Sequence, residues 1–114
     1  MLNLRRSVVG VVAVLLVSGV ASAQTTDIAA LANAGDATAQ NRLGHAYFLG
    51  QGMPQDYVGA HRWYNLAASR ATSDDQKRYA GTRDEVATQM TPAQIAEAQR
   101  LAREWQAAFD ARQE

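Results

Sequence analysis

The fold is decided by residues 34–68, which read AGDATAQNRLGHAYFLGQGMPQDYVGAHRWYNLAA. Asp36 and Asp56 each precede a helix-forming segment, and an Asp in this position caps a helix by accepting a hydrogen bond from a free backbone amide. Gly50 and Gly52 follow the first segment, and glycine ends a helix readily because it adopts positive φ at little steric cost. The pattern therefore predicts two helices, from Ala37 to about Gly50 and from Tyr57 to about Arg70.

Apolar and small side chains recur at three- and four-residue steps in both helices, which places them on one side of each helix. Small residues at these steps let two helix backbones approach closely, and the aromatic residues fill the space between helix pairs. The positions that we expect to form this structural core are Ala39, Leu43, Gly44, Tyr47, Gly50, Gly52, Ala60, Trp63, Tyr64 and Ala67.

Further helices are predicted on both sides of this pair. A short helix from Asp27 to Ala34 precedes it and ends at Gly35. After the pair, Ser73 is expected to open another helix, with Gln76 as its capping-box partner. The inner face of that helix is expected to carry Tyr79, Val86 and Met90.

The start of the last helix is predicted from three residues. Thr91 fits the cap position of an α-helix, Pro92 the first helical position and Gln94 the third. Arg100 and Glu104 form a predicted surface pair on its outer side. Because the linkers are only a few residues long, we expect successive helices to pack as antiparallel neighbours. The expected fold class is all-α, with about five helices. The inner side of the last helix is expected to carry Ile95, Ala98, Ala102, Trp105 and Phe109.

The N-terminal residues have the composition of a secretory signal peptide. Arg5 and Arg6 precede an apolar run, and a small-x-small pattern ends at Ala23, where signal peptidase would cut before Gln24. The apolar run is shorter than the roughly 20 residues that a membrane-spanning helix needs. We therefore expect residues 1–23 to be removed and residues 24–114 to be one periplasmic or secreted domain without a membrane anchor. Many Ala and Arg residues and a single Lys are typical of a GC-rich bacterial genome.

Charge and cysteine content argue against several kinds of partner. Without Arg5 and Arg6, nine basic residues remain against eleven acidic ones, so the formal net charge is −2. A charge this small and evenly mixed gives no electrostatic reason to bind nucleic acid or an anionic membrane. The sequence contains no Cys, which excludes disulfides and thiolate metal ligands.

No catalytic or metal-binding pattern is visible. His45 and His61 lie on different predicted helices with no carboxylate at ligand spacing, so we expect both to be surface histidines. The adjacent acids Asp74 and Asp75 would point about 100° apart on a helix and would not converge on one substrate atom. The sequence therefore predicts no catalytic residue, no metal and no cofactor.

Residues 33–69 resemble a Sel1-like repeat, a relative of the tetratricopeptide repeat. The resemblance implies antiparallel helix pairs of the α–α superhelix type. It covers about one repeat period, so the helix before it is interpreted as half of a lost repeat. Residues 73–112 are interpreted as a degenerate capping pair. The motifs that carry the resemblance are AGDAxAQ at 34–40, LGxxYxxGxG at 43–52, PQD at 54–56 and AxxWYxxAA at 60–68.

The resemblance implies a non-catalytic adaptor that binds another protein. In such repeats the first helix of each pair lines the concave surface, so the candidate partner-contact residues are Asn41, His45 and Phe48. Their spacing of four and then three residues keeps them on one side of the helix. Phe48 has an alternative place in the core, beneath a flanking helix. Two other functions stay open: a small envelope enzyme or enzyme-modulating protein, and a scaffold in which a solitary repeat pairs with a second copy.

Overall fold

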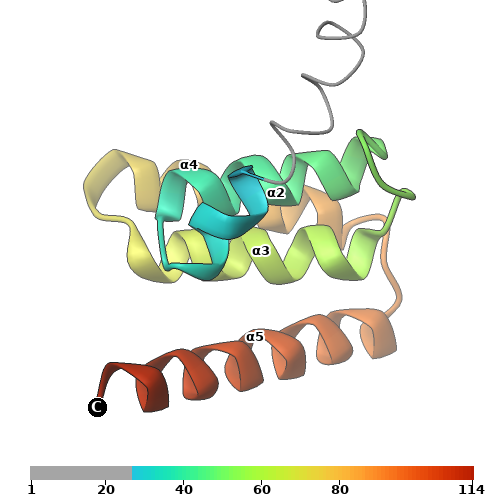
Figure 1. Ribbon diagram of the computed structural model, residues 1–114. Helices are drawn as coiled ribbons and strands as arrows, with labels where there is room; N and C mark the ends of the chain where they lie inside the picture. The colour runs from blue at the N-terminus through green and yellow to red at the C-terminus, as the bar shows by residue number, and fades with distance from the viewer. Residues whose placement is uncertain (1–26) are drawn as a thin grey trace, which may run out of the picture.

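The computed structural model describes residues 27–114, and all of their regular structure is helical (Figure 1). Residues 27–33 are helical, and four longer helices follow. No strand occurs in residues 27–114, so the expected all-α fold class is confirmed. The predicted signal peptide and its cleavage site between Ala23 and Gln24 lie outside these residues. The four helices are α2 (Ala37–Leu49), α3 (Tyr57–Arg70), α4 (Ser73–Ala87) and α5 (Pro92–Gln113).

Local signals fix the ends of α2 and the start of α3. The carboxylate of Asp36 accepts a hydrogen bond from the amide of Ala39, and Asp56 accepts one from Gly59. Gly50 ends α2 in the left-handed region, at a φ of 70°. This helical pair therefore has the caps that its sequence predicts.

The start of α5 is also as predicted, and the start of α4 is not. The hydroxyl of Thr91 accepts a hydrogen bond from the amide of Gln94, whose side chain accepts one from Thr91 in return. At α4 the predicted capping box is wrong: Thr72 takes the cap position without a side-chain hydrogen bond, and Ser73 has a φ of 55°. A capping residue needs extended backbone geometry, which Ser73 does not have.

The central helix is α3, and α2, α4 and α5 all pack against it. α2 and α4 run antiparallel to α3, whereas α5 runs parallel to it (Figure 1). α4 and α5 therefore run antiparallel to each other, but the expectation that successive helices pack as neighbours is wrong for this pair, because each of them packs against α3. The apolar side chains explain why. Ala102 of α5 is buried with Trp63 and Leu66 on one side of α3, and Tyr79 and Val86 of α4 are buried against another side.

The sequence-predicted core positions differ in how deeply they lie. Tyr47 and Gly50 are half-buried, and Gly52 is exposed in the loop between α2 and α3, with a φ of 73°. The buried positions are Ala39, Leu43, Gly44, Ala60, Trp63, Tyr64 and Ala67.

α5 also closes over the N-terminal helical residues. Nε1 of Trp105 donates a hydrogen bond to the side-chain oxygen of Asn33, 72 residues earlier, at 3.2 Å. Nε of Arg70 donates to the carbonyl of Gly35 at 2.7 Å, and its guanidinium lies 4.4 Å from the ring centre of Phe109. These contacts join the two ends of the described chain into one layer over α3.

Adding a methyl group at Gly44 should destabilise the fold, whereas the same change at Gly81 should stabilise it. A Cβ at Gly44 would lie 2.9 Å from ring carbons of Tyr64 and 3.2 Å from the carbonyl oxygen of Ala60. Overpacking of this kind costs about 1–3 kcal/mol, which outweighs the helix-propensity gain of about 0.5–1 kcal/mol. At exposed Gly81 a Cβ would meet nothing within 4 Å, so the propensity gain remains. Urea unfolding of Gly44→Ala and Gly81→Ala checks the two signs, and a stabilised Gly44→Ala protein would contradict the close approach of α2 and α3.

Candidate functional site

α3 is covered on three sides by other helices, and its fourth side is open. Successive residues of an α-helix are rotated by about 100°, so steps of four, three and four residues follow one stripe. Val58, Arg62, Asn65 and Ser69 lie along such a stripe, and each is half-buried or exposed, while the other residues inside the helix are buried. The open stripe has α4 on one side and α5 on the other.

Two hollows meet on this stripe, and we call them together the α3 groove. The hollow toward α5 has a volume of about 640 Å³, and the hollow toward α4 about 380 Å³. Asn65 and Ser69 line both hollows and form the shared floor. The other polar and charged lining residues are Arg70, Arg103 and Gln106 on the α5 side and Gln76, Lys77 and Arg83 on the α4 side.

The α3 groove concentrates positive charge. Arg70, Lys77, Arg83 and Arg103 line it, and none of its lining residues is acidic. Arg83 is partly neutralised, since its Nε lies 3.0 Å from a carboxylate oxygen of the neighbouring Asp84. The other three cations form no ion pair with any residue in the described part of the chain. This segregation is notable in a region that carries more acidic than basic residues.

Arg83 also joins the two helices at the floor of the groove. Its Nη1 donates a hydrogen bond to the side-chain oxygen of Asn65 at 3.0 Å. The hydroxyl of Ser69 donates to the carbonyl of Leu66 in its own helix at 2.7 Å. The amide nitrogen of Asn65 and the lone pairs of Ser69 stay available to a bound molecule, one as donor and the other as acceptor.

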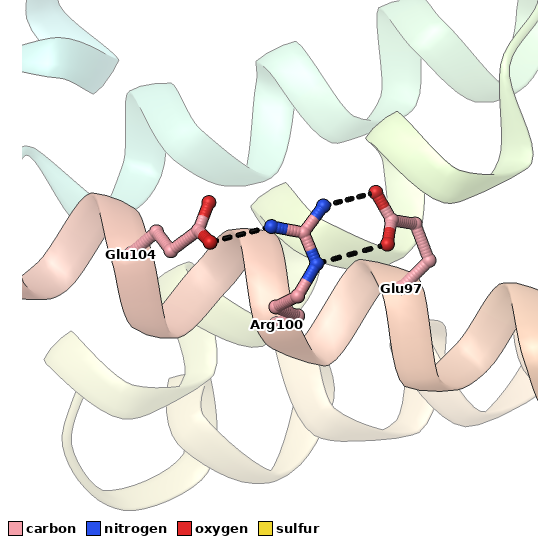
Figure 2. A network of polar contacts seen from close by, with 3 residues as sticks. All are labelled: Glu97, Arg100 and Glu104. Carbon is pink, nitrogen blue, oxygen red and sulfur yellow. Dashed lines mark hydrogen bonds and ion pairs between the residues drawn. The ribbon is translucent and has the colours of Figure 1, made fainter.

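Two acidic residues of α5, Glu97 and Glu104, lie outside the groove, whereas Asp110 accepts a hydrogen bond from the groove-lining Gln106 at 2.8 Å. Arg100 donates hydrogen bonds to Glu97 and Glu104, one turn away in each direction (Figure 2). The hydrogen bond from Arg100 lowers the pKa of Glu97, and both acceptors raise the pKa of Arg100. Helical spacing puts this network opposite the buried Ala102, while Arg103 lines the groove. Arg100 thus neutralises part of the negative charge of this network, which is directed away from the cationic groove.

The candidate contact residues of α2 lie outside the α3 groove. His45 is exposed, while Asn41 and Phe48 are half-buried. Phe48 packs against the cluster that contains Tyr64, and its ring centre lies 5.7 Å from that of Tyr57. Phe48 is therefore part of the helix packing rather than an exposed aromatic anchor. The three residues do not share a surface with the cationic groove.

His61 is buried, with 3% of its surface exposed, so the expectation of a surface histidine is wrong for this residue. Burial lowers its pKa, and Arg83 lowers it further against the opposing effect of Asp84. Its position in α3 explains the burial. His61 lies four residues before Asn65 and seven residues before the buried Ala68, so its side chain is on the side of α3 that faces α4. Burial also favours the neutral form of Tyr64 in the core, whose pKa it raises to about 12.

Acidification should destabilise the protein partly through His61. Because the folded-state pKa lies below the unfolded value of 6.5, the stability that neutral His61 contributes is present above pH 6.5 and lost as the pH falls through the folded value. His61→Gln should therefore reduce the loss of unfolding free energy between pH 7 and pH 5, measured by urea unfolding. His45→Gln, at an exposed position, is the matched control and should keep the wild-type slope because His61 is retained. An unchanged slope in His61→Gln would contradict this role.

Neither a metal centre nor a membrane-spanning helix is found in residues 27–114. There, no three His, Asp or Glu side chains are grouped so as to hold a metal ion. The helices of the same region are all too short or too polar to cross a bilayer. The groove itself contains neither a histidine nor a carboxylate among its lining residues.

Comparison with known proteins identifies the central hairpin. Residues 37–71 match the family model described as Sel1 repeat, which confirms the resemblance seen in the sequence. The match begins at the first residue of α2 and ends one residue after α3, so it includes the groove floor, whereas α4 and α5 lie beyond it. No curated protein and no solved structure matches the chain.

Proposed function

The chain carries a Sel1 repeat, a unit that generally mediates protein–protein interaction and is typically non-enzymatic, and we propose on this basis that it is an exported, non-catalytic adaptor. The observation that carries the proposal is the open face of α3. A central helix that is buried on three sides and hollowed on the fourth, over Asn65 and Ser69, offers a concave surface to a partner. The α3 groove replaces the α2 face as the proposed contact site.

The chemistry of the groove supports binding rather than catalysis. Proton transfer in enzymes is most often carried out by histidine or by carboxylates, and neither lines the groove. Ser69, the one hydroxyl of the floor, donates its hydrogen bond to the carbonyl of Leu66, and Lys77, which lines the same hollow, forms no hydrogen bond with it. The small-enzyme alternative therefore has less support than the adaptor.

Export is supported by the sequence of residues 1–23 and is tested separately. The mature protein from a cell-envelope fraction should have the intact mass of a chain that starts at Gln24, or that mass less one ammonia if the glutamine has cyclised. Recovery of the chain from Met1 in the membrane fraction would overturn the proposal of cleaved export to the periplasm.

Adaptor function is tested by placing a photo-cross-linking amino acid at Ser69 in the groove and, in a second variant, at His45 on α2. Both positions are exposed. Because replacing His45 removes its hydrogen bond with the hydroxyl of Tyr64 at 3.4 Å, the melt of each variant is compared with that of the wild type first. In the source cell, the Ser69 variant should cross-link a distinct second protein, and the His45 variant should give much less of that product. A product made of two copies of this chain would favour the self-associating scaffold, and the absence of any product at Ser69 would refute binding through the groove.

A further inference from the structure

We propose that the α3 groove binds an extended, acidic peptide segment of the partner, with carboxylates on both sides of a polar stretch that crosses α3. This inference rests on the proposed adaptor function, because it assigns a chemistry to the partner of the same site. The proposed ligand is a protein segment with a few negative charges that are separated by neutral residues, in contrast to a polyanion.

The charge of the groove is the first support. Arg70, Lys77 and Arg103 have no acidic partner in the described residues, and no carboxylate lines either hollow. Arg70 is half-buried, and Lys77 and Arg103 are exposed. A cluster of unpaired cations of this kind attracts and orients an anionic ligand, with an effect that weakens as salt is added. The ligand therefore supplies the carboxylates that the groove lacks.

The division of the groove into two hollows determines how those carboxylates are spaced. Arg70 and Arg103 stand on the α5 side of α3, and Lys77 and Arg83 stand on the α4 side. α4 and α5 each pack against α3 and not against each other. Packed helix axes lie about 8–10 Å apart, so the axes of α4 and α5 stand up to about 16–20 Å apart, and an extended chain advances about 3.3 Å per residue. A peptide that crosses α3 would thus place its acidic residues about three to six positions apart, one for each pair of cations.

The floor of the groove suits the polar stretch between these acids. The amide nitrogen of Asn65 is available to donate to a peptide carbonyl, since its oxygen already accepts from Arg83. The oxygen of Ser69 is available to accept from a peptide N–H, because its proton is directed to Leu66. One donor and one acceptor on neighbouring turns of α3 match the alternating groups of a peptide backbone.

A polyanion such as a nucleic acid fits this surface less well than a short acidic segment. Asp74 and Asp75 lie exposed at the start of α4, directly before the groove residues Gln76 and Lys77. Asp75 is paired with Arg78 at 2.6 Å, so Asp74 provides the unpaired negative charge that would repel a continuous run of phosphates leaving the groove. A peptide with two or three spaced carboxylates places its charge in the groove and neutral residues at the rim.

The experiment selects ligands without assuming their sequence. Random linear peptides displayed on phage are selected on the purified protein, and the affinity of a labelled selected peptide is measured by fluorescence anisotropy. We expect the selected peptides to share acidic residues about three to six positions apart. Their affinity should fall at least about tenfold in the double variant Lys77→Glu with Arg103→Glu, because like charges then face each other across the site. Arg42→Glu, an exposed reversal on α2 outside the groove, is the matched control and should change it by less than about twofold.

Selection of peptides without acidic residues, failure to select any peptide, or insensitivity to the double variant would overturn the inference. It would also be overturned if a single-stranded oligonucleotide, or a second copy of the chain, bound the groove more tightly than the selected peptide. The cross-link at Ser69 separates this inference from the adaptor function. A partner cross-linked at Ser69 through a neutral segment would preserve the adaptor function and refute the acidic ligand, whereas no cross-link at Ser69 would refute binding of any partner through the groove.

Discussion

Trp63→Ala should abolish cooperative unfolding or lower its midpoint by a very large amount. Trp63 is 3% exposed and packs in one cluster with side chains from α2, α5 and the N-terminal helical residues. Truncating a buried Trp to Ala costs about 3–5 kcal/mol, and small domains are often stabilised by little more than about 5 kcal/mol in total. Thermal and urea unfolding followed by circular dichroism at 222 nm measures the loss.

Trp63→Phe is the matched control, since it keeps an aromatic ring at the junction of these helices and should unfold cooperatively at an intermediate midpoint. A Trp63→Ala protein that melted close to wild type would mean that Trp63 is not at the centre of the packing. It would then also contradict the position of α5, whose Ala102 and Trp105 pack on the same cluster.

The second large effect is expected at Trp105, which holds α5 on the rest of the molecule. Its ring meets Trp63 edge-on at a centroid distance of 5.8 Å, stacks on Phe109 at 5.0 Å and donates a hydrogen bond to Asn33. Because Trp105 is half-buried, Trp105→Ala should cost about 2–3 kcal/mol, somewhat less than a fully buried Trp. Hydrogen exchange should show the loss of protection concentrated in α5, with α2 and α3 less affected.

Trp105→Phe retains the ring and removes the hydrogen bond to Asn33, so its α5 amides should exchange at a rate between those of wild type and Trp105→Ala. If protection fell uniformly across all helices in Trp105→Ala, α5 would be an inseparable part of one cooperative unit rather than a separately held layer.

Features that depend on a few neighbouring residues could be predicted from the sequence. The caps Asp36 and Asp56 and the Thr91 capping box bond to amides within three residues, so their spacing contains the whole interaction. Ser73 has the same type of spacing, yet its positive φ removes it from the cap position. A backbone dihedral of this kind is set by the turn that joins α3 to α4, so it could not be predicted from the residue type at position 73.

The arrangement of helices and the groove depend on contacts that sequence spacing does not encode. The apolar stripe of α5 fits several neighbours, and nothing local assigns it to α3 rather than to α4. His61 is buried because α4 happens to cover it, although its residue type is compatible with the surface. The groove is lined by residues from four helices. Its one local sign in the sequence is the polar stripe through Arg62, Asn65 and Ser69, in a helix whose other inner residues are buried.

The hydrogen bond from Trp105 to Asn33 has a consequence for the order in which the molecule assembles. The α2–α3 hairpin is built from contacts between neighbours in sequence, so we expect it to form early, whereas docking of α5 must close a loop of 72 residues. Refolding should therefore end with the docking of α5, and its rate should respond to changes in the α4–α5 connection more than to changes within the hairpin. The side of Trp63 that packs on α5 stays exposed until α5 has been synthesised and has docked, so the packing around Trp63 is expected to be completed last.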